Sequence, residues 1–156
     1  MGSINDSPIR FIASDLDGTL LGKLDATHAF RETWLSLPEA ERPVLCYNTG
    51  RLLDDTCSLI EEEILPPPDY LICGVGTLIY DYRNKRELKS FQTVLEEGWD
   101  LKKVDEVVQS LFQGIRKQPD YYQTPYKSSW YLENGTEADI RRLDDCLLYT
   151  SPSPRD

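Results

Sequence analysis

Three short apolar runs, separated by segments with helical spacing, most constrain the fold of this chain. The runs are "IRFIAS" (9–14), "VLCYN" (44–48) and "YLICGVG" (70–76), and their apolar residues are continuous instead of alternating with polar ones. Residues 25–37 and 49–64 carry apolar side chains three or four positions apart, as amphipathic helices do. Strands of this kind that alternate with helices are typical of parallel sheets covered by helices. The sequence therefore predicts an open, Rossmann-like α/β core with parallel strands.

The helix boundaries and strand ends locate the candidate site. We expect Asp25 or Thr27 to cap the first helix, because both residue types accept hydrogen bonds from free N–H groups at a helix start. The second helix should open at 49–51 and stop before the prolines at 66–68. In open α/β sheets, ligands bind beyond the carboxyl ends of the strands. The residues expected at these ends are Asp15, Asp17, Asn48, Thr49, Gly74 and Gly76.

The second half of the chain has a different pattern. A hairpin is expected within 78–89, turning near Asn84, and apolar spacing predicts a helix over 99–115. The alternating run "YKSSWYLE" (126–133) predicts a strand with one solvated face. A turn at Asn134-Gly135 then leads into a helix that opens at Thr136. We therefore expect a second, α+β module from about residue 80 onward.

Charge and composition exclude several classes of function. The formal net charge of −10 argues against nucleic acid or an anionic membrane as a partner. No apolar run reaches the roughly 20 residues that span a bilayer, and the first ten residues lack the apolar core of a signal peptide. Three of the four cysteines lie in apolar segments without metal-binding or redox spacing, which is typical of reduced core cysteines. These features predict a cytoplasmic protein.

The last eleven residues, "CLLYTSPSPRD" (146–156), do not continue the pattern before them. One choice of codons back-translates them to the transposase adapter used in short-read sequencing libraries, and a genuine Ser/Pro-rich terminus is the alternative. We expect a non-native tail that interrupts the helix opened at Thr136. The natural chain would then continue beyond Asp145.

The run Asp15-Leu16-Asp17-Gly18-Thr19 carries the strongest chemical signal. Two carboxylates so close together repel one another, so they are tolerated mainly where a cation or a reaction uses them. Asp15 could attack phosphorus as a nucleophile, while Asp17 could protonate a leaving alkoxide and then deprotonate water. Mg²⁺ commonly binds one or two carboxylates together with phosphate oxygens, and backbone N–H groups at the Gly18 turn could cradle the anion. The alternative is a purely structural role, in which the aspartates belong to a turn or cap a helix.

A second candidate element is "YNTGRLL" (47–53), at the end of the neighbouring strand. A hydroxyl at Thr49 and free N–H groups at Gly50 would face the same crevice as the aspartates. By itself a Thr-Gly pair at a helix start is most often only a cap. Its position beside the Asp15–Asp17 run favours a phosphate-binding role.

These segments together resemble a known superfamily. "DLDGTL" on the first strand and "NTGR" on the second resemble the haloacid dehalogenase superfamily of phosphotransferases. "PPPDYLICGVGTLIY", "EEGWD" and "PYKSSWYLE" are similar in order and spacing to sucrose-6-phosphate phosphatases. The resemblance covers residues 8–145. It implies a partial catalytic core at 1–81 and part of a mobile α+β cap at 82–145.

The resemblance also implies residue roles. Asp15 would be the nucleophile and an Mg²⁺ ligand, and Asp17 the acid/base and an Mg²⁺ ligand through its backbone carbonyl. Thr49 would hold the transferring phosphoryl oxygen. The phosphate would also meet Leu16, Gly18 and Gly50, and the sugar would meet Asn48 and Lys127, although Lys127 could equally be a solvated surface lysine.

This chain departs from the family pattern in two respects. Leu78 stands where the family usually has a glutamate that contacts the sugar. The later lysine that neutralises the phosphate and the downstream acidic loop that completes the Mg²⁺ site are not in this sequence. We therefore expect this chain to be an aggregation-prone, poorly active fragment with an exposed sheet edge.

The expected function is that of an Mg²⁺-dependent phosphomonoesterase acting on a sugar phosphate, and sucrose 6-phosphate is the first candidate substrate. Two alternatives stay open. One is a phosphatase for another sugar or sugar-acid phosphate. The other is a silent sugar-phosphate-binding domain, as could occur beside a sucrose-phosphate-synthesising enzyme.

Overall fold

The computed structural model describes the backbone of residues 8–150 and the side chains of residues 8–147. The chain forms two compact units that divide between Leu88 and Lys89. Residues 151–156 of the expected tail, with Pro152 and Pro154, lie outside the described part. Within that part, no helix is long and apolar enough to cross a membrane.

The first unit alternates strands and helices, as the apolar runs predict. Its regular elements, in chain order, are β1 (Phe11–Ser14), the irregular turn η1 (Leu16–Leu20), α1 (Leu24–Ser36), η2 (Glu39–Glu41), β2 (Val44–Asn48), α2 (Leu53–Glu61), β3 (Tyr70–Cys73), β4 (Leu78–Asp81) and β5 (Arg86–Glu87). The three predicted strands are all present, and the third ends three residues earlier than expected.

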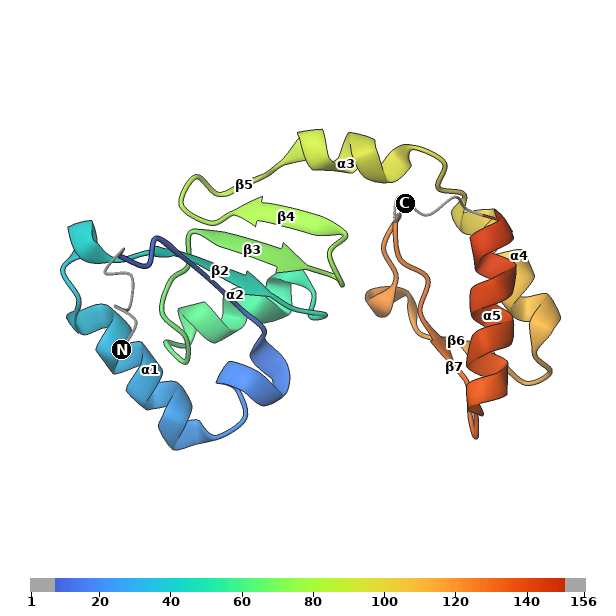
Figure 1. The fold of residues 1–156 in the computed structure, drawn as a ribbon, viewed down its shortest axis with the longest axis horizontal. Coiled ribbons are helices and arrows are strands. Elements are labelled where there is room, and N and C mark those ends of the chain that lie inside the picture. Colours follow the sequence, from blue (N-terminus) through green and yellow to red (C-terminus); the bar gives the residue numbers. More distant parts are fainter. Residues whose placement is uncertain (1–7, 151–156) are drawn as a thin grey trace, which may run out of the picture. The chain divides into compact units, whose positions relative to one another are not determined.

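These strands form one mixed sheet of five strands in the order β1-β2-β3-β4-β5. β1, β2 and β3 are parallel, whereas β4 pairs antiparallel with β3 and with β5. Figure 1 shows β2, β3 and β4 side by side, with β4 running against its neighbour. The predicted α/β class with parallel core strands is therefore confirmed, and the sheet has two strands more than the apolar runs alone indicate.

Both helices of the first unit pack on the same face of the sheet. Trp34 of α1 and Ile60 of α2 belong to one buried cluster with strand residues such as Leu45 and Leu71. Right-handed crossovers that step in one direction along a sheet place their helices on one side, which explains this arrangement. Phe11, whose side chain alternates away from that cluster, is 57% exposed.

The loops at two helix starts differ from prediction. α1 begins at Leu24 after Lys23, which makes no side-chain cap. Thr27 does not cap it either, because its hydroxyl donates to the carbonyls of Leu20 and Lys23. α2 begins at Leu53, so residues 49–51 form a loop and not the first helical turn.

The predicted hairpin turns where expected but belongs to the first unit. β4 and β5 extend the sheet past β3, so the compact unit continues to Leu88. Asp81, which is 5% exposed, accepts hydrogen bonds from the backbone N–H of Asn84 (3.0 Å) and from its side-chain Nδ2 (2.8 Å). These two bonds to Asn84, with a smaller effect of Arg86, hold the pKa of Asp81 below its ordinary value.

This pKa shift predicts a pH-dependent effect of Asn84→Ala. A carboxyl whose folded-state pKa is depressed adds stability above its unfolded-state pKa, and that stability is lost as the pH falls through the folded-state pKa. Asn84→Ala removes the side-chain bond, so the urea midpoint should fall at pH 7. The difference from wild type should shrink at acid pH, once the pH has fallen through the lowered folded-state pKa of Asp81. Urea titrations followed by circular dichroism at both pH values measure this, and an equal difference at both would contradict it.

The second unit is the predicted α+β module with different boundaries. Its elements are α3 (Lys89–Glu96), α4 (Leu101–Leu111), β6 (Arg116–Lys117), η3 (Asp120–Tyr122), β7 (Trp130–Tyr131) and α5 (Glu137–Thr150). The strand predicted over 126–133 is wrong in extent, because only Trp130 and Tyr131 pair, with β6. α5 continues to Thr150, so the expected interruption at residue 146 is also wrong; "CLLYT" contains no proline or glycine that would end a helix.

The cysteines of the first unit behave as expected. Cys46 and Cys73 are buried, and none of the four cysteines is in a disulfide. Burial raises the pKa of the Cys73 thiol to about 11, so the thiol stays protonated at neutral pH.

Candidate active site

The loop that follows β1 presents both aspartates to solvent. Leu16, the residue between them, is fully buried in the core cluster, whereas Asp15 and Asp17 are exposed. Gly18 has a φ of +76°, a left-handed conformation that residues with a Cβ adopt only with strain. Leu16 therefore anchors the loop, and the glycine turns the chain so that both carboxylates lie at the carboxyl end of the strand.

The Asp15 carboxylate has a hydrogen-bond partner within its own loop. The Thr19 hydroxyl donates a hydrogen bond of 3.1 Å to Asp15 Oδ2. This bond links both ends of the five-residue motif and restricts the rotamer of the carboxylate. An oriented and exposed carboxylate is what nucleophilic attack requires.

Asp17 is paired with Arg51, a residue that sequence reasoning did not assign to the site. Arg51 Nη2 lies 2.7 Å from Asp17 Oδ1, and Arg51 Nε lies 2.9 Å from Asp17 Oδ2. Mainly through these hydrogen bonds, the guanidinium holds the pKa of Asp17 below its ordinary value. The bidentate pair joins the loop after β1 to the loop after β2. The arginine of "NTGR" is the one sequence feature that could have indicated this pair. Its partner could not be identified from the sequence, because that depends on which strands are neighbours in the sheet.

The Thr49–Arg51 loop is fixed by the strands beside it. The Thr49 N–H donates to the Ile72 carbonyl at 2.9 Å, and the Gly74 N–H donates to the Arg51 carbonyl at 2.8 Å. The Thr49 side chain is 3% exposed, and its hydroxyl accepts from the Arg51 N–H at 3.2 Å. The loop is therefore held in a defined shape without being helical. The phosphate-binding roles of Leu16, Gly18, Thr49 and Gly50 stay predictions.

Asn48 and Lys127, the two residues expected to meet the sugar, lie in different units. Asn48 is the exposed last residue of β2, next to the loop just described. Lys127 lies in the second unit, in a tight turn where its backbone exchanges two 3.2 Å hydrogen bonds with Thr124. It is half-buried and not part of a strand. Its role toward a substrate stays a prediction.

The two aspartates offer the kind of ligand that Mg²⁺ prefers. The carboxylate of Asp15 and the backbone carbonyl of Asp17 are hard oxygen donors, and Mg²⁺ often takes one or two protein carboxylates with waters and phosphate oxygens. Among the described residues, no group of three or more His, Cys, Asp or Glu side chains could hold a metal. The pair thus fits Mg²⁺ as part of a ligand set.

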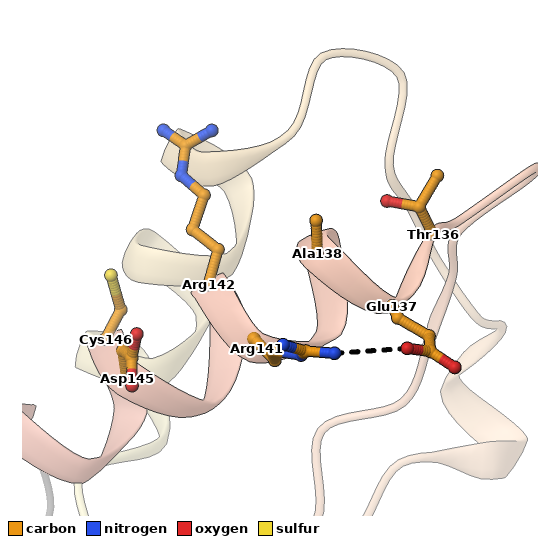
Figure 2. A pocket seen from close by; sticks show the side chains of 7 residues that line it. All are labelled: Thr136, Glu137, Ala138, Arg141, Arg142, Asp145 and Cys146. Atoms are coloured by element: carbon orange, nitrogen blue, oxygen red, sulfur yellow. Dashed lines mark hydrogen bonds and ion pairs between the residues drawn. The ribbon is translucent and has the colours of Figure 1, made fainter.

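Two open hollows in the described part are lined by residues other than those of the candidate site. One of about 730 Å³ lies along α5 in the second unit, and Figure 2 shows Arg141 paired there with Glu137 while Arg142 points elsewhere. Another of about 400 Å³ lies in the first unit, beside Pro43 and Asp69, which precede β2 and β3. These are the amino ends of the strands, opposite to the ends where such sheets bind ligands.

The fold and the chemistry of the two loops together define a class of protein. An α/β sheet with parallel core strands, in which "DLDGT" follows the first strand and a Thr-Gly-Arg loop follows its neighbour, is the arrangement of haloacid dehalogenase-like proteins. Residues 8–151 match the family described as Sucrose-6F-phosphate phosphohydrolase. The chain belongs to this family of sugar-phosphate phosphatases, as the sequence resemblance implied.

Named relatives are similar over most of this chain. It is 40% identical over 141 residues to mannosylfructose-phosphate phosphatase of Agrobacterium fabrum, covering 90% of this chain and 56% of that sequence. It is 31% identical to sucrose-phosphatase 1 of Nicotiana tabacum, covering 96% of this chain and 38% of that sequence. The chain therefore spans about half, or less, of the length of these relatives.

Solved structures show the same fold. The sucrose-phosphatase of Synechocystis sp. PCC6803, in complex with sucrose and phosphate, superposes with a TM-score of 0.80 at 25% identity, covering 92% of this chain and 57% of that one. A haloacid dehalogenase-like hydrolase from Bacillus subtilis, yhjK, has a TM-score of 0.50 at 16% identity over 70% of this chain and 52% of its own, and this likeness concerns the fold alone.

Proposed function

We propose that this chain is the part of an Mg²⁺-dependent phosphomonoesterase that carries its nucleophile and its acid/base. The observation that supports this most is the exposed Asp15–Asp17 pair at the carboxyl end of β1, tied to the neighbouring loop through Arg51. A domain that only bound a sugar phosphate would not need a second carboxylate beside the first, because it would only repel the ligand.

In this mechanism, Asp15 attacks phosphorus, so that a P–O bond to Asp15 forms while the bond to the sugar oxygen breaks. Asp17 gives a proton to that oxygen as it leaves. In the second step Asp17 takes a proton from water, which attacks the aspartyl phosphate and releases inorganic phosphate. Mg²⁺, when bound by Asp15 and the Asp17 carbonyl, would offset negative charge on the phosphoryl group.

The pairing with Arg51 suits the second step. It favours the ionised form of Asp17, which accepts a proton from water. The same pairing opposes the protonated form that the first step needs, so the ion pair must open when Asp17 acts as the acid. Thr49, Gly50 and the N–H groups of the Gly18 turn would surround the phosphoryl oxygens. Each group comes from a loop that the sheet holds in place.

For the substrate we propose a disaccharide phosphorylated on its fructose unit. The family description contains sucrose 6F-phosphate, and the Agrobacterium relative is named for mannosylfructose phosphate. Sucrose and mannosylfructose both contain fructose and differ in the other sugar. Sucrose 6-phosphate and mannosylfructose phosphate are therefore the two candidates. A partnership with an enzyme that synthesises the same sugar phosphate fits either one.

A chimeric enzyme would test this proposal. Residues 8–145 of this chain would replace the matching segment of the Agrobacterium phosphatase, which supplies the length that this chain does not span. We expect release of phosphate from one of the two disaccharide phosphates, dependent on Mg²⁺ and abolished by a chelator.

The 156-residue chain alone, assayed beside the chimera, should show no detectable turnover. The parent Agrobacterium enzyme is the control for assay and folding. A folded chimera that binds either disaccharide phosphate without hydrolysing it would favour the binding-domain alternative. Hydrolysis of simple hexose phosphates alone would contradict the proposed substrate class.

A further inference from the structure

The turn that follows β3 is left-handed over three consecutive residues. The φ angles of Gly74, Val75 and Gly76 are +60°, +62° and +84°. The turn is closed by the Thr77 N–H, which donates to the Cys73 carbonyl at 3.1 Å, and by the Thr77 hydroxyl, which donates to the Gly74 carbonyl at 2.9 Å. Left-handed helical geometry is unfavourable for residues with a Cβ, and a β-branched residue there is a true outlier.

Val75 stands out among the described non-glycine residues with positive φ. The others are Glu63, Lys85 and Asn134, and none of them is β-branched. Its side chain is also 71% exposed, so burial in the core does not explain an apolar residue here. Glycine would occupy this position without strain. Strained residues of this kind concentrate at active sites, ligand clamps and switch regions.

The turn is built onto the candidate active site. The N–H groups of Gly74 and Val75 donate to the carbonyls of Arg51 (2.8 Å) and Thr49 (3.4 Å). A Cβ added at Gly50 would lie 3.8 Å from Val75 Cγ2, so the valine lies beside the glycine of the proposed phosphate loop. Arg51 in turn holds Asp17. Val75 therefore presents methyl groups to solvent at the edge of the site where the phosphate is proposed to bind.

We propose that Val75 is a specificity-determining residue that packs against the sugar of the substrate. The inference rests on the proposed function, because it assigns Val75 to the organic part of the same phosphomonoester. The left-handed turn aims the isopropyl group outward, and the C–H face of a sugar ring would cover it. The side chain contributes no group that could bind phosphate, so its effect should depend on the sugar.

The test measures binding of two ligands, inorganic phosphate and sucrose 6-phosphate, to the chimeric enzyme with Asp15→Asn, which removes the nucleophile so that the sugar phosphate is not hydrolysed during the titration. Nuclear magnetic resonance titrations that follow the amide signals of Thr19 and Gly50 give both dissociation constants. Val75→Ala removes the methyl groups and keeps a Cβ, whereas Val75→Gly also removes the strain. Val94→Ala is the matched control, because Val94 is a 60% exposed valine of the second unit.

We expect both Val75 variants to weaken sucrose 6-phosphate binding about four- to fifteenfold, the effect of losing one or two methyl contacts. Binding of inorganic phosphate should stay within about twofold, and Val94→Ala should change neither constant. Val75→Gly should also raise the urea midpoint of the chain, since it relieves the left-handed conformation.

Three results would overturn the inference. Val75 variants that bind the sugar phosphate as wild type does would show that the side chain does not contact it. Equal weakening of both ligands would show that the turn acts through the phosphate loop alone. A chimera that keeps Val75 and binds neither ligand would overturn the proposed phosphate site as well, so failure of the proposed function is distinguishable from failure of this inference.

Discussion

Asp15→Asn in the chimeric enzyme is expected to abolish turnover of the disaccharide phosphate. The asparagine amide keeps the shape of the carboxylate and can still accept the hydrogen bond from Thr19, but it is too weak a nucleophile to attack phosphorus. Removing a nucleophile from a cooperating catalytic set reduces turnover by at least about 10⁴-fold. Release of phosphate under saturating substrate measures the effect, and mass spectrometry of a rapidly quenched reaction locates the phosphoryl group.

Asp25→Asn is the matched control for this substitution. Asp25 is an exposed aspartate in the first turn of α1, outside the candidate site. The control should retain the activity of the parent chimera. A phosphoryl group trapped on any residue other than Asp15, or substantial turnover in Asp15→Asn, would contradict the assigned nucleophile.

Asp17→Asn should reduce turnover by about 10²–10⁴-fold, the usual contribution of a general acid or base. The loss should be larger for the disaccharide phosphate than for p-nitrophenyl phosphate in the cleavage step, because nitrophenolate leaves without needing a proton. Steady-state rates with both substrates, together with single-turnover measurements, separate the two steps.

Asp17→Asn also breaks the ion pair with Arg51, so Arg51→Gln is the informative control. It breaks the same pair and keeps the carboxylate. Because the two side chains are partly exposed, loss of the pair alone should change the free energy of unfolding by at most about 1 kcal/mol. If both variants lost activity equally with both substrates, Asp17 would act through the ion pair and not as an acid/base.

The parts of the fold that the sequence predicts are those decided by local pattern. The apolar runs locate β1, β2 and β3, and the Asn84 turn locates the hairpin, because continuous burial and turn chemistry both leave local signals. The aspartate motif places Asp15 and Asp17 at a strand end for the same reason.

The parts that were missed depend on distant partners. Residues 49–52 carry no helix breaker apart from Gly50, yet they form a loop because bonds from Gly74 and to Ile72 hold the backbone away from helical geometry. The Arg51–Asp17 pair could not be predicted, since it joins residues 34 positions apart through the order of the strands.

The shortened strand of the second unit has a similar cause. The Gln123 side-chain amide donates to the carbonyls of Gln118 and Ser129 and accepts from the Ser129 N–H. These bonds supply partners to backbone N–H and C=O groups that a longer pair of strands would otherwise have bonded to each other. The alternation of "YKSSWYLE" indicates which side chains are buried. It does not indicate whether the backbone N–H and C=O groups bond to a side chain or to a neighbouring strand.

The left-handed turn after β3 has a consequence for how the specificity of this protein can change. Its backbone is closed by bonds from Thr77 and is flanked by two glycines, so the residue between them contributes little to the core. Replacing Val75 by glycine, asparagine or aspartate, the residue types that tolerate this geometry, would relieve strain while changing the chemistry displayed beside the phosphate loop. Most substitutions in a folded protein lower its stability, whereas these are expected to raise it. Selection could therefore alter the sugar preference here without first acquiring compensating mutations elsewhere.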